Sequence, residues 1–131
     1  MNNREKLQCF YEAVTKGDRV AAESVMHSDF TIHEAEGLPY AGVYKGKETW
    51  WKLFARIGTI WTEMKIDSLS IIGEPGGNEF AWYMRMSGKS AATGKTFDTT
   101  ILERWVLKDG LLFEVRPHYW DTKQLADANT P

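Results

Sequence analysis

Apolar side chains in the first half of the chain recur every three or four residues, the spacing of a helix with one buried face. The pattern predicts helices over residues 4–16, 19–26 and 47–57. Gly17 can end the first helix in the left-handed conformation, and Asp18 can cap the second. The apolar stripe of the third helix consists of Trp50, Leu53, Phe54 and Ile57.

From Trp61 onward apolar side chains recur at every second residue, as expected for strands whose side chains alternate between two faces. The predicted strands cover residues 29–36, 61–72 and 79–89, followed by a hairpin within residues 96–121 that turns at Lys108-Asp109-Gly110. The alternation slips near Asp67-Ser68, which predicts a bulge. Residues 37–42 are predicted to form a loop, and residues 122–128 a short terminal helix.

This order of elements predicts one α+β domain that spans residues 1–131, because helices segregated to one side of an antiparallel sheet are typical of that class. A strongly curved, mainly antiparallel sheet wrapped over the first helix leaves a cone. We therefore expect a cone-shaped α+β barrel with three N-terminal helices. The mouth of such a cone is a usual place for a small-molecule site.

When every second residue is assigned to the same face, one face of the last hairpin carries ionisable and aromatic side chains together. They are Glu103, Trp105, Glu114, Arg116, His118 and Trp120. A half-buried sheet normally turns its charged side chains toward water. Charged groups among tryptophans therefore predict that this face lines a ligand cavity.

Composition and charge exclude several kinds of partner. The net charge is −2 and the isoelectric point is near 5.9, without a basic patch typical of nucleic-acid binding. The chain has no apolar stretch of about 18 residues that predicts a membrane span, and no secretory signal is visible. The single cysteine, Cys9, excludes an internal disulfide. We expect a cytoplasmic protein without a nucleic-acid or membrane partner.

Short motifs for phosphate and metal sites are incomplete in this sequence. Gly88-Lys-Ser90 and Gly94-Lys-Thr96 each match the end of a phosphate loop, but they lack the upstream glycine and lie in a predicted hairpin. His27, His33 and His118 are scattered and lack zinc-ligand spacing. We therefore expect no metal and no cofactor.

Several strings of residues, spread over nearly the whole chain, resemble those of a known superfamily. They are Phe10–Asp18, Asp29–Glu34, Leu38–Gly42, Tyr44–Gly46 and Arg116–Asp121. On these strings the chain resembles the nuclear transport factor 2-like superfamily, and within it the ketosteroid isomerases and the SnoaL-like polyketide cyclases. The resemblance implies the cone-shaped fold. It leaves the reaction open, because isomerases, cyclases, hydratases, epoxide hydrolases and non-catalytic binders share the scaffold.

The resemblance also implies roles for individual residues. Glu34 falls where ketosteroid isomerases have the aspartate that acts as general base, and Glu103 where they have a protonated oxyanion-hole aspartate. Phe10 falls at the oxyanion-hole tyrosine and has no hydroxyl, so the principal donor is missing. Arg116 and His118 fall at positions that are apolar in those enzymes, which implies a more charged pocket than a steroid site.

Proton transfer next to a carbonyl needs a carboxylate or an imidazole in a dry place, where burial moves its pKa toward neutrality. Glu34, Glu103 and His118 are the candidate catalytic residues, with Glu34 as the base and His118 and Arg116 polarising the carbonyl. The candidate ligand-binding residues are Arg116, Trp120, Glu114, Trp105 and Tyr40. Tyr40 and Tyr44 either close the mouth of the cone or, as loop tyrosines more often do, only pack. As an alternative, Arg116 forms a purely structural ion pair with Glu114 or Glu103.

The sequence supports two main functions. The first is a small isomerase, cyclase or lyase that transfers a proton on an apolar carbonyl compound without a cofactor. The second is a non-catalytic protein of the same fold that holds a small apolar or weakly acidic metabolite, and the missing oxyanion tyrosine favours it. Epoxide hydrolysis by a carboxylate pair and an arginine is a third possibility, and only the fold argues for a protein-transport adaptor.

The outer face of the predicted sheet is too apolar to remain in water. It carries Tyr83, Leu102, Val106, Phe113, Val115 and Tyr119. Dimers that form through this face are common in the superfamily that the chain resembles, so we expect a homodimer.

Overall fold

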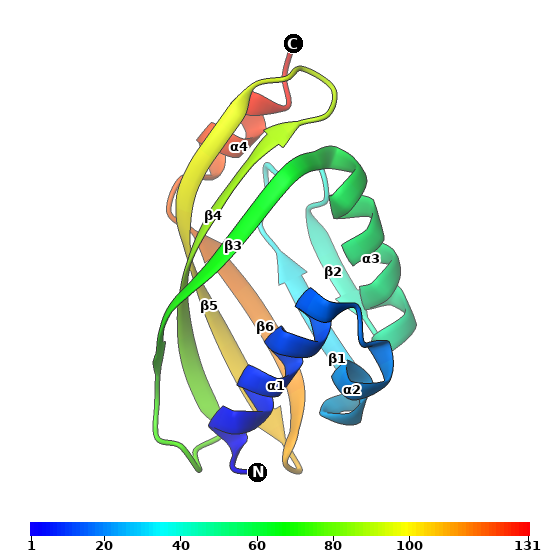
Figure 1. The fold of residues 1–131 in the computed structure, drawn as a ribbon, viewed down its shortest axis with the longest axis vertical. Helices are drawn as coiled ribbons and strands as arrows, with labels where there is room; N and C mark the ends of the chain where they lie inside the picture. Colours follow the sequence, from blue (N-terminus) through cyan, green and yellow to red (C-terminus); the bar gives the residue numbers. More distant parts are fainter.

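Six strands form one curved sheet in the computed structural model, which describes residues 1–131 (Figure 1). The elements are α1 (Asn3–Lys16), α2 (Arg19–Ser24), β1 (Met26–Glu34), β2 (Gly42–Lys45), α3 (Lys47–Ile60), β3 (Trp61–Ile72), β4 (Glu79–Ser90), β5 (Thr96–Lys108), β6 (Leu111–Tyr119) and α4 (Thr122–Ala128). The strand order is β2-β1-β6-β5-β4-β3, and only the β1–β6 pair is parallel. The predicted α+β fold, with helices against a curved and mainly antiparallel sheet, is confirmed.

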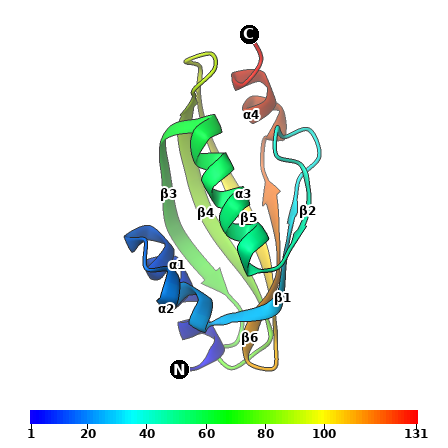
Figure 2. The same cartoon turned by 90° about the vertical axis from the view of Figure 1, so that its right-hand side faces the viewer.

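Helices α1 and α3 lie across the concave side of the sheet, and α2 connects α1 to β1 (Figures 1 and 2). Asn2 begins α1 with a capping box, and Gly17 ends it in the predicted left-handed conformation, at φ 73°. Helix α1 buries Phe10, and α3 buries Trp50 and Leu53. The apolar stripes of the two helices thus turn toward the sheet.

An aromatic cluster fixes the helices over the sheet. The ring of Phe10 lies 5.3 Å from that of Trp50 in α3 and 5.5 Å from that of Trp105 in β5, measured between centroids. Phe30 in β1 stacks on Trp105 at 5.9 Å. Such aromatic pairs contribute about 0.5–1.5 kcal/mol each beyond the area they bury. The cluster therefore ties α1, α3, β1 and β5 together at one end of the concave side.

The turn between β5 and β6 has the geometry that its sequence predicts. Asp109 and Gly110 both adopt positive φ angles, 54° and 72°. A two-residue hairpin loop of the type I′ class requires this conformation at both positions, and Asp-Gly is one of its preferred sequences.

A β-bulge follows this turn in β6. Leu107 pairs with Leu112, but the next pair joins Val106 to Glu114, so Phe113 is an extra residue without a partner. Leu107 and Leu112 both point into the core. The extra residue then reverses the alternation of β6, and every later side chain of the strand lies on the face opposite to the one predicted.

The strands near the N-terminus differ from the prediction. The first strand covers Met26–Glu34 rather than residues 29–36, and β2 forms directly after the predicted loop and pairs with β1. The sheet has six strands rather than a four-stranded meander with a separate first strand, because β1 pairs with β6 in parallel. The predicted bulge is present as a register shift between Ser68 and Ser70, and α4 has the predicted bounds.

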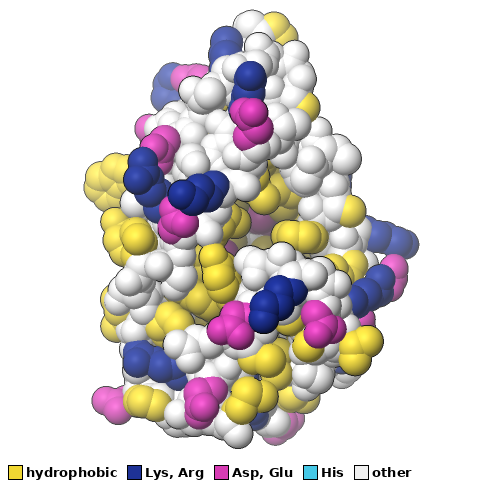
Figure 3. Space-filling view, viewed as in Figure 1, with side chains coloured by type: hydrophobic (Ala, Val, Ile, Leu, Met, Phe, Trp, Pro, Cys, Tyr) yellow, Lys and Arg dark blue, Asp and Glu magenta, His cyan; other side chains and the backbone are white.

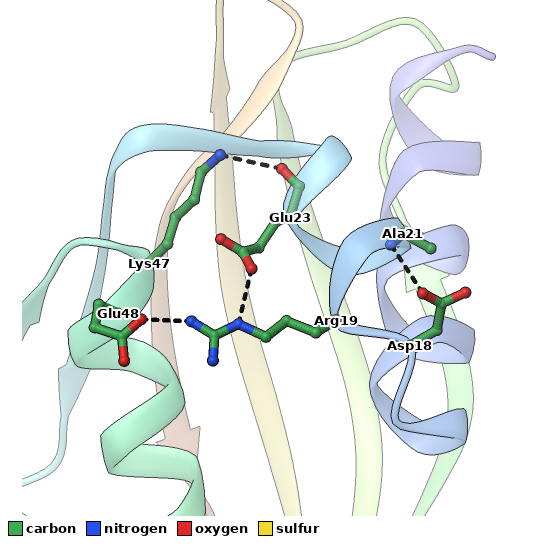
Figure 4. A network of polar contacts seen from close by, with 6 residues as sticks. All are labelled: Asp18, Arg19, Ala21, Glu23, Lys47 and Glu48. Carbon is green, nitrogen blue, oxygen red and sulfur yellow. Dashed lines mark hydrogen bonds and ion pairs between the residues drawn. The ribbon is translucent and has the colours of Figure 1, made fainter.

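Arg19 connects α2 to the beginning of α3 (Figure 4). Its Nε donates a hydrogen bond of 2.9 Å to Glu23 in α2, and its guanidinium also pairs with Glu48 in α3. Lys47 Nζ donates to the backbone carbonyl oxygen of Glu23 at 3.2 Å. Exposed pairs of this kind contribute little to stability, but together they set the first turn of α3 against α2.

Candidate active site

A cavity of about 350 Å³ lies between the concave face of the sheet and the helices α1 and α3. Twenty-one residues line it, and 18 of them are hydrophobic. Its opening is the hollow in the middle of Figure 3, where hydrophobic side chains gather around the rim. The polar lining residues are Thr15, Glu34 and Glu103, and no Lys, Arg or His side chain is among them. The cavity therefore suits an apolar ligand that meets two carboxyl groups.

Glu34 is the last residue of β1 and lines the cavity with only 8% of its surface exposed. It lies on the predicted face of the strand, with Phe30 and Ile32. Its Oε1 accepts a hydrogen bond of 3.1 Å from the hydroxyl of Tyr119. Burial raises the pKa of Glu34 to about 8, helped by the charge of Glu103 and opposed by the Tyr119 hydrogen bond. Glu34 thus keeps its proton at neutral pH.

Glu103 lies on β5 and lines the same cavity. The indole Nε1 of Trp105 donates a hydrogen bond of 3.1 Å to its Oε1. The side chain is partly accessible, but the space that it meets is the apolar cavity, and burial raises its pKa to about 7. The two carboxyl groups therefore titrate near neutral pH.

A chain of hydrogen bonds leads from Glu34 into the core. Tyr119 donates to Glu34, the hydroxyl oxygens of Tyr119 and Tyr40 are 3.5 Å apart, and Trp61 Nε1 donates to the Tyr40 hydroxyl at 3.1 Å. Burial raises the pKa of Tyr40 to about 12 and that of Tyr119 well above its ordinary value, so both hydroxyls stay protonated. Tyr40 does line the cavity, but it is fully buried, so of the two alternatives for this tyrosine it packs and does not close the mouth.

Helix α1 offers no free tyrosine hydroxyl to the carboxyl pair. Phe10 lines the cavity with a ring that packs on Trp50 and Trp105. Tyr11 also lines it, but its hydroxyl donates to the backbone carbonyl oxygen of Ile66 at 2.7 Å. A donor for a ligand oxygen has to come from another element.

Part of the predicted site lies on the opposite, outer face of the sheet. This part consists of Glu114, Arg116, His118 and Trp120, all beyond the bulge in β6. Arg116 and His118 are exposed, and Trp120 is 86% exposed. The prediction that these side chains face the cavity is wrong because the bulge reverses the alternation. Val115 and Tyr119, which were predicted on the outer face, line the cavity instead.

The alternative interpretation of Arg116 is also wrong, because Arg116 forms no ion pair with Glu114 or Glu103. The Glu114 carboxylate instead lies 3.5 Å from His33 Nε2 and 4.0 Å from Arg104 Nη1. These contacts lie on the outer face of the sheet and do not reach the cavity.

Tyr119 is the missed cavity residue that makes a hydrogen bond to the site, whereas Trp105 and Tyr40 do line the cavity as predicted. A signal for Tyr119 was present. Val115, Pro117 and Tyr119 alternate with polar residues, which is the ordinary pattern of a strand with one buried face. Counting by twos across the turn gave the other face because it made no allowance for an extra residue.

Residues 7–115 match the family model of the SnoaL-like domain. The chain belongs to the SnoaL-like domain family. No curated protein matches this SnoaL-like domain. The match runs from Leu7 in α1 to Val115 in the middle of β6 and therefore includes Glu34, Tyr40 and Glu103 but not Tyr119.

Solved structures share the fold of this SnoaL-like domain over nearly its full length. An NTF2-like protein from Burkholderia thailandensis has a TM-score of 0.90 at 22% identity, with 100% of this chain and 99% of that chain covered. TerC, co-crystallized with polyporic acid, has a TM-score of 0.83 at 18% identity, with 98% of each chain covered. A protein assigned as a SnoaL-like polyketide cyclase, from a Jannaschia species, has a TM-score of 0.80 at 14% identity, with 98% and 92% covered. The predicted superfamily is confirmed, and at these identities the structures show the fold alone.

No helix of this SnoaL-like domain is both long and apolar enough to cross a bilayer. Nor do three or more His, Cys, Asp or Glu side chains gather where they could hold a metal ion. The cavity itself brings together two acidic side chains, Glu34 and Glu103, without a histidine or cysteine beside them.

Proposed function

We propose that this SnoaL-like domain is a cofactor-independent isomerase, cyclase or lyase that moves a proton next to the carbonyl group of an apolar compound. The supporting observation is the carboxyl pair in the cavity, with pKa values of about 8 for Glu34 and about 7 for Glu103. A group whose pKa lies near the working pH is best able both to take and to return a proton.

The surroundings of the two carboxyl groups support a division of roles. Glu103 is the more accessible of the two, so we assign it as the base that removes a proton from the carbon next to the carbonyl. Glu34 keeps its proton and stabilises the charge that develops on the carbonyl oxygen. The C–H electron pair becomes the C=C bond of an enolate, and the π electrons of the carbonyl move onto its oxygen, to which Glu34 donates a hydrogen bond. Glu103 then returns the proton to a different atom, so the step balances without an oxidant. This assignment reverses the roles that the resemblance to ketosteroid isomerases implies.

The lining of the cavity supports a neutral ligand. An anionic compound would meet two acidic groups and no basic side chain, so a neutral carbonyl compound replaces the weakly acidic metabolite as the proposed ligand. Epoxide hydrolysis with the help of an arginine finds no support, because Arg116 lies on the outer face.

Deuterium exchange tests this function directly. In heavy water, the native protein is expected to exchange the methyl protons of 2-acetylnaphthalene, a neutral aromatic ketone. Glu103→Gln is expected to lose about 100-fold or more of this activity. Glu34→Gln loses less, because its amide still donates a hydrogen bond. His118→Gln, on the outer face, is the matched control and keeps native exchange.

Three results would contradict the proposal or its roles. Loss of exchange in Glu34→Gln with full activity in Glu103→Gln restores the roles that the resemblance implies. Loss in His118→Gln returns His118 to the site. If neither this ketone nor other neutral aryl ketones undergo exchange with the native protein, the proton-transfer proposal fails.

A second candidate function is non-catalytic binding of a neutral ligand, and one observation favours it. Phe10 has no hydroxyl, and the hydroxyl of Tyr11 is already bonded to the backbone. Binding of the ketone without any exchange distinguishes this function from the first.

A homodimer is the proposed assembly. Large apolar side chains remain exposed on the outer face of the sheet, namely Tyr83 at 39%, Leu102 at 41% and Trp120 at 86%. All three line one shallow groove together with His118. A second copy of this chain is proposed to cover them.

A further inference from the structure

The hydrogen-bonded chain that ends at Glu34 has a direction, which follows from counting donors and acceptors. An indole N–H only donates, so Trp61 donates to the hydroxyl oxygen of Tyr40. When Tyr40 donates to Tyr119 and Tyr119 donates to Glu34 Oε1, each hydroxyl donates once and accepts once. Every proton of the chain then has an acceptor, and Oε1 receives a hydrogen bond, which suits the carbonyl oxygen of a neutral carboxyl group because that oxygen is the stronger acceptor.

The opposite direction leaves a buried proton without a partner. An acid proton on Oε1 of Glu34 would donate to Tyr119, which would donate to Tyr40. The Tyr40 oxygen would then receive two donors, one of them from Trp61, and its own O–H would have no acceptor. Tyr40 and Trp61 are each only 1% exposed, so solvent does not replace that acceptor. An unsatisfied buried hydroxyl is costly, and Trp61 therefore fixes the direction.

We infer that Trp61, Tyr40 and Tyr119 are positioning residues that hold the acid proton of Glu34 on Oε2, so that Glu34 donates a hydrogen bond into the cavity. The partner is an acceptor oxygen on a neutral ligand. Oε2 is the oxygen that accepts no hydrogen bond from the protein, and Glu34 lines the cavity. The pKa of about 8 keeps this proton in place at neutral pH.

This donor takes the place of the hydroxyl that Phe10 lacks, and it approaches the ligand from β1 rather than from α1. That the acceptor is a carbonyl oxygen rests on the proposed function. The direction of the chain rests on the hydrogen bonds alone and involves no reaction.

Few titratable groups act on this donor. Glu103 faces it from β5, Tyr119 from β6 and Tyr40 from the segment before β2. Tyr11 lines the cavity from α1 with its hydroxyl bonded to the backbone. The lining residues from α3, β3 and β4 are all apolar. Glu103, with a pKa of about 7, also titrates between the two pH values of the test below, so Glu34→Leu is needed to separate its effect from loss of the proton of Glu34.

The test compares two compounds of the same shape, 2-acetylnaphthalene and 2-isopropenylnaphthalene, which differ by a carbonyl oxygen against a methylene group. Dissociation constants are measured by calorimetry at about one and a half pH units below and above the pKa of about 8. Below the pKa, the ketone is expected to bind about two- to tenfold more tightly than the alkene, as one net hydrogen bond provides. Above the pKa this advantage is lost. Glu34→Leu lacks it at both pH values.

Variants of the hydrogen-bonded residues distinguish a positioning role from a merely structural one. Trp61→Phe and Tyr119→Phe are expected to bring the affinity for the ketone close to the affinity for the alkene. They are expected to leave the affinity for the alkene unchanged. A merely structural role would weaken both compounds alike. Tyr44→Phe is the matched control, because it removes a hydroxyl that donates to the backbone carbonyl oxygen of Tyr40 at 2.9 Å, outside the chain. It keeps the native advantage.

Several outcomes overturn the inference. They are equal affinities of the native protein for the two compounds below the pKa, an advantage that survives in Glu34→Leu, and an unchanged advantage in Trp61→Phe. Failure of the native protein to bind either compound overturns it as well. If a variant of one of the hydrogen-bonded residues does not fold, the pH series on the native protein still tests the inference. If the ketone binds more tightly than the alkene but undergoes no deuterium exchange, this inference stands and the enzymatic proposal fails.

Discussion

At the scale of single residues, Glu34 and Glu103 make the folded protein bind protons more tightly than the unfolded chain does. Burial raises the pKa of Glu34 to about 8 and that of Glu103 to about 7, from an ordinary value of 4.5. Between the ordinary and the raised values, the folded protein holds protons that the unfolded chain has released. The free energy of unfolding must therefore fall as the pH rises through this window.

The first prediction follows from this sign. From pH 4.5 to about 8, Glu34 decreases the free energy of unfolding by up to about 1.4 kcal/mol per pH unit. Glu34→Gln has no proton to release, so its unfolding free energy is expected to change less steeply with pH than that of the native protein. Urea unfolding at a series of pH values measures both slopes. A native stability that is constant or rises across the window would mean that the two carboxyl groups are not enclosed as described.

At the scale of elements, the hairpin of β5 and β6 decides which side chains reach the cavity. The turn at Asp109 and Gly110 sets the pairing of the two strands, and the extra residue Phe113 then moves Tyr119 to the inner face. A register error of one residue would turn Glu114, Arg116 and His118 inward. The conformation of the turn is therefore tied to the chemistry of the site through the strand that follows it.

The second prediction concerns Gly110. Its φ of 72° lies in the left-handed region, and an added Cβ would come within 3.1 Å of Lys6 Nζ. Gly110→Ala is expected to lower the free energy of unfolding by about 1 kcal/mol or more. Gly76→Ala is the matched control, because a Cβ there meets no atom within 4 Å and its φ is outside that region. Urea denaturation compares the two, and equal effects would contradict a strained turn.

The elements that the sequence predicted well are those set by neighbouring residues. The stripe of Trp50, Leu53 and Phe54 marks α3, and the Asp-Gly turn marks the last hairpin. The parallel pairing of β1 with β6 depends on segments far apart in the chain, so local periodicity did not predict it. Glu34 and Glu103 were found because the alternation of side chains is regular around each of them, from Phe30 to Glu34 and from Ile101 to Trp105, and because both match positions implied by the resemblance. Tyr119 was missed because the bulge at Phe113 leaves only a weak trace in the order of residues.

At the scale of the whole molecule, the curved sheet has one face on the cavity and one on solvent. The outer face mixes charged side chains such as Arg85 and Arg104 with apolar ones. Tyr83 pairs with Leu102 across β4 and β5, and Leu102 pairs with His118 across β5 and β6. The exposed apolar side chains are thus neighbours on one surface, and a contiguous patch of this kind marks an interaction site.

The third prediction is that a second copy of the chain covers this face. A specific interface buries roughly 1,600 Å² in total. Leu102 lies between paired residues of both neighbouring strands, so an interface of this size on the outer face covers it. Leu102→Glu would place a carboxylate there and is expected to give a monomer, while the native protein is a dimer by light scattering at micromolar concentration. Val20→Glu is the matched control, because Val20 is 82% exposed on α2, away from the outer face of the sheet, and this variant remains a dimer. Native protein that is monomeric at this concentration contradicts the proposed assembly. A Leu102→Glu variant that is still dimeric places the interface on another surface.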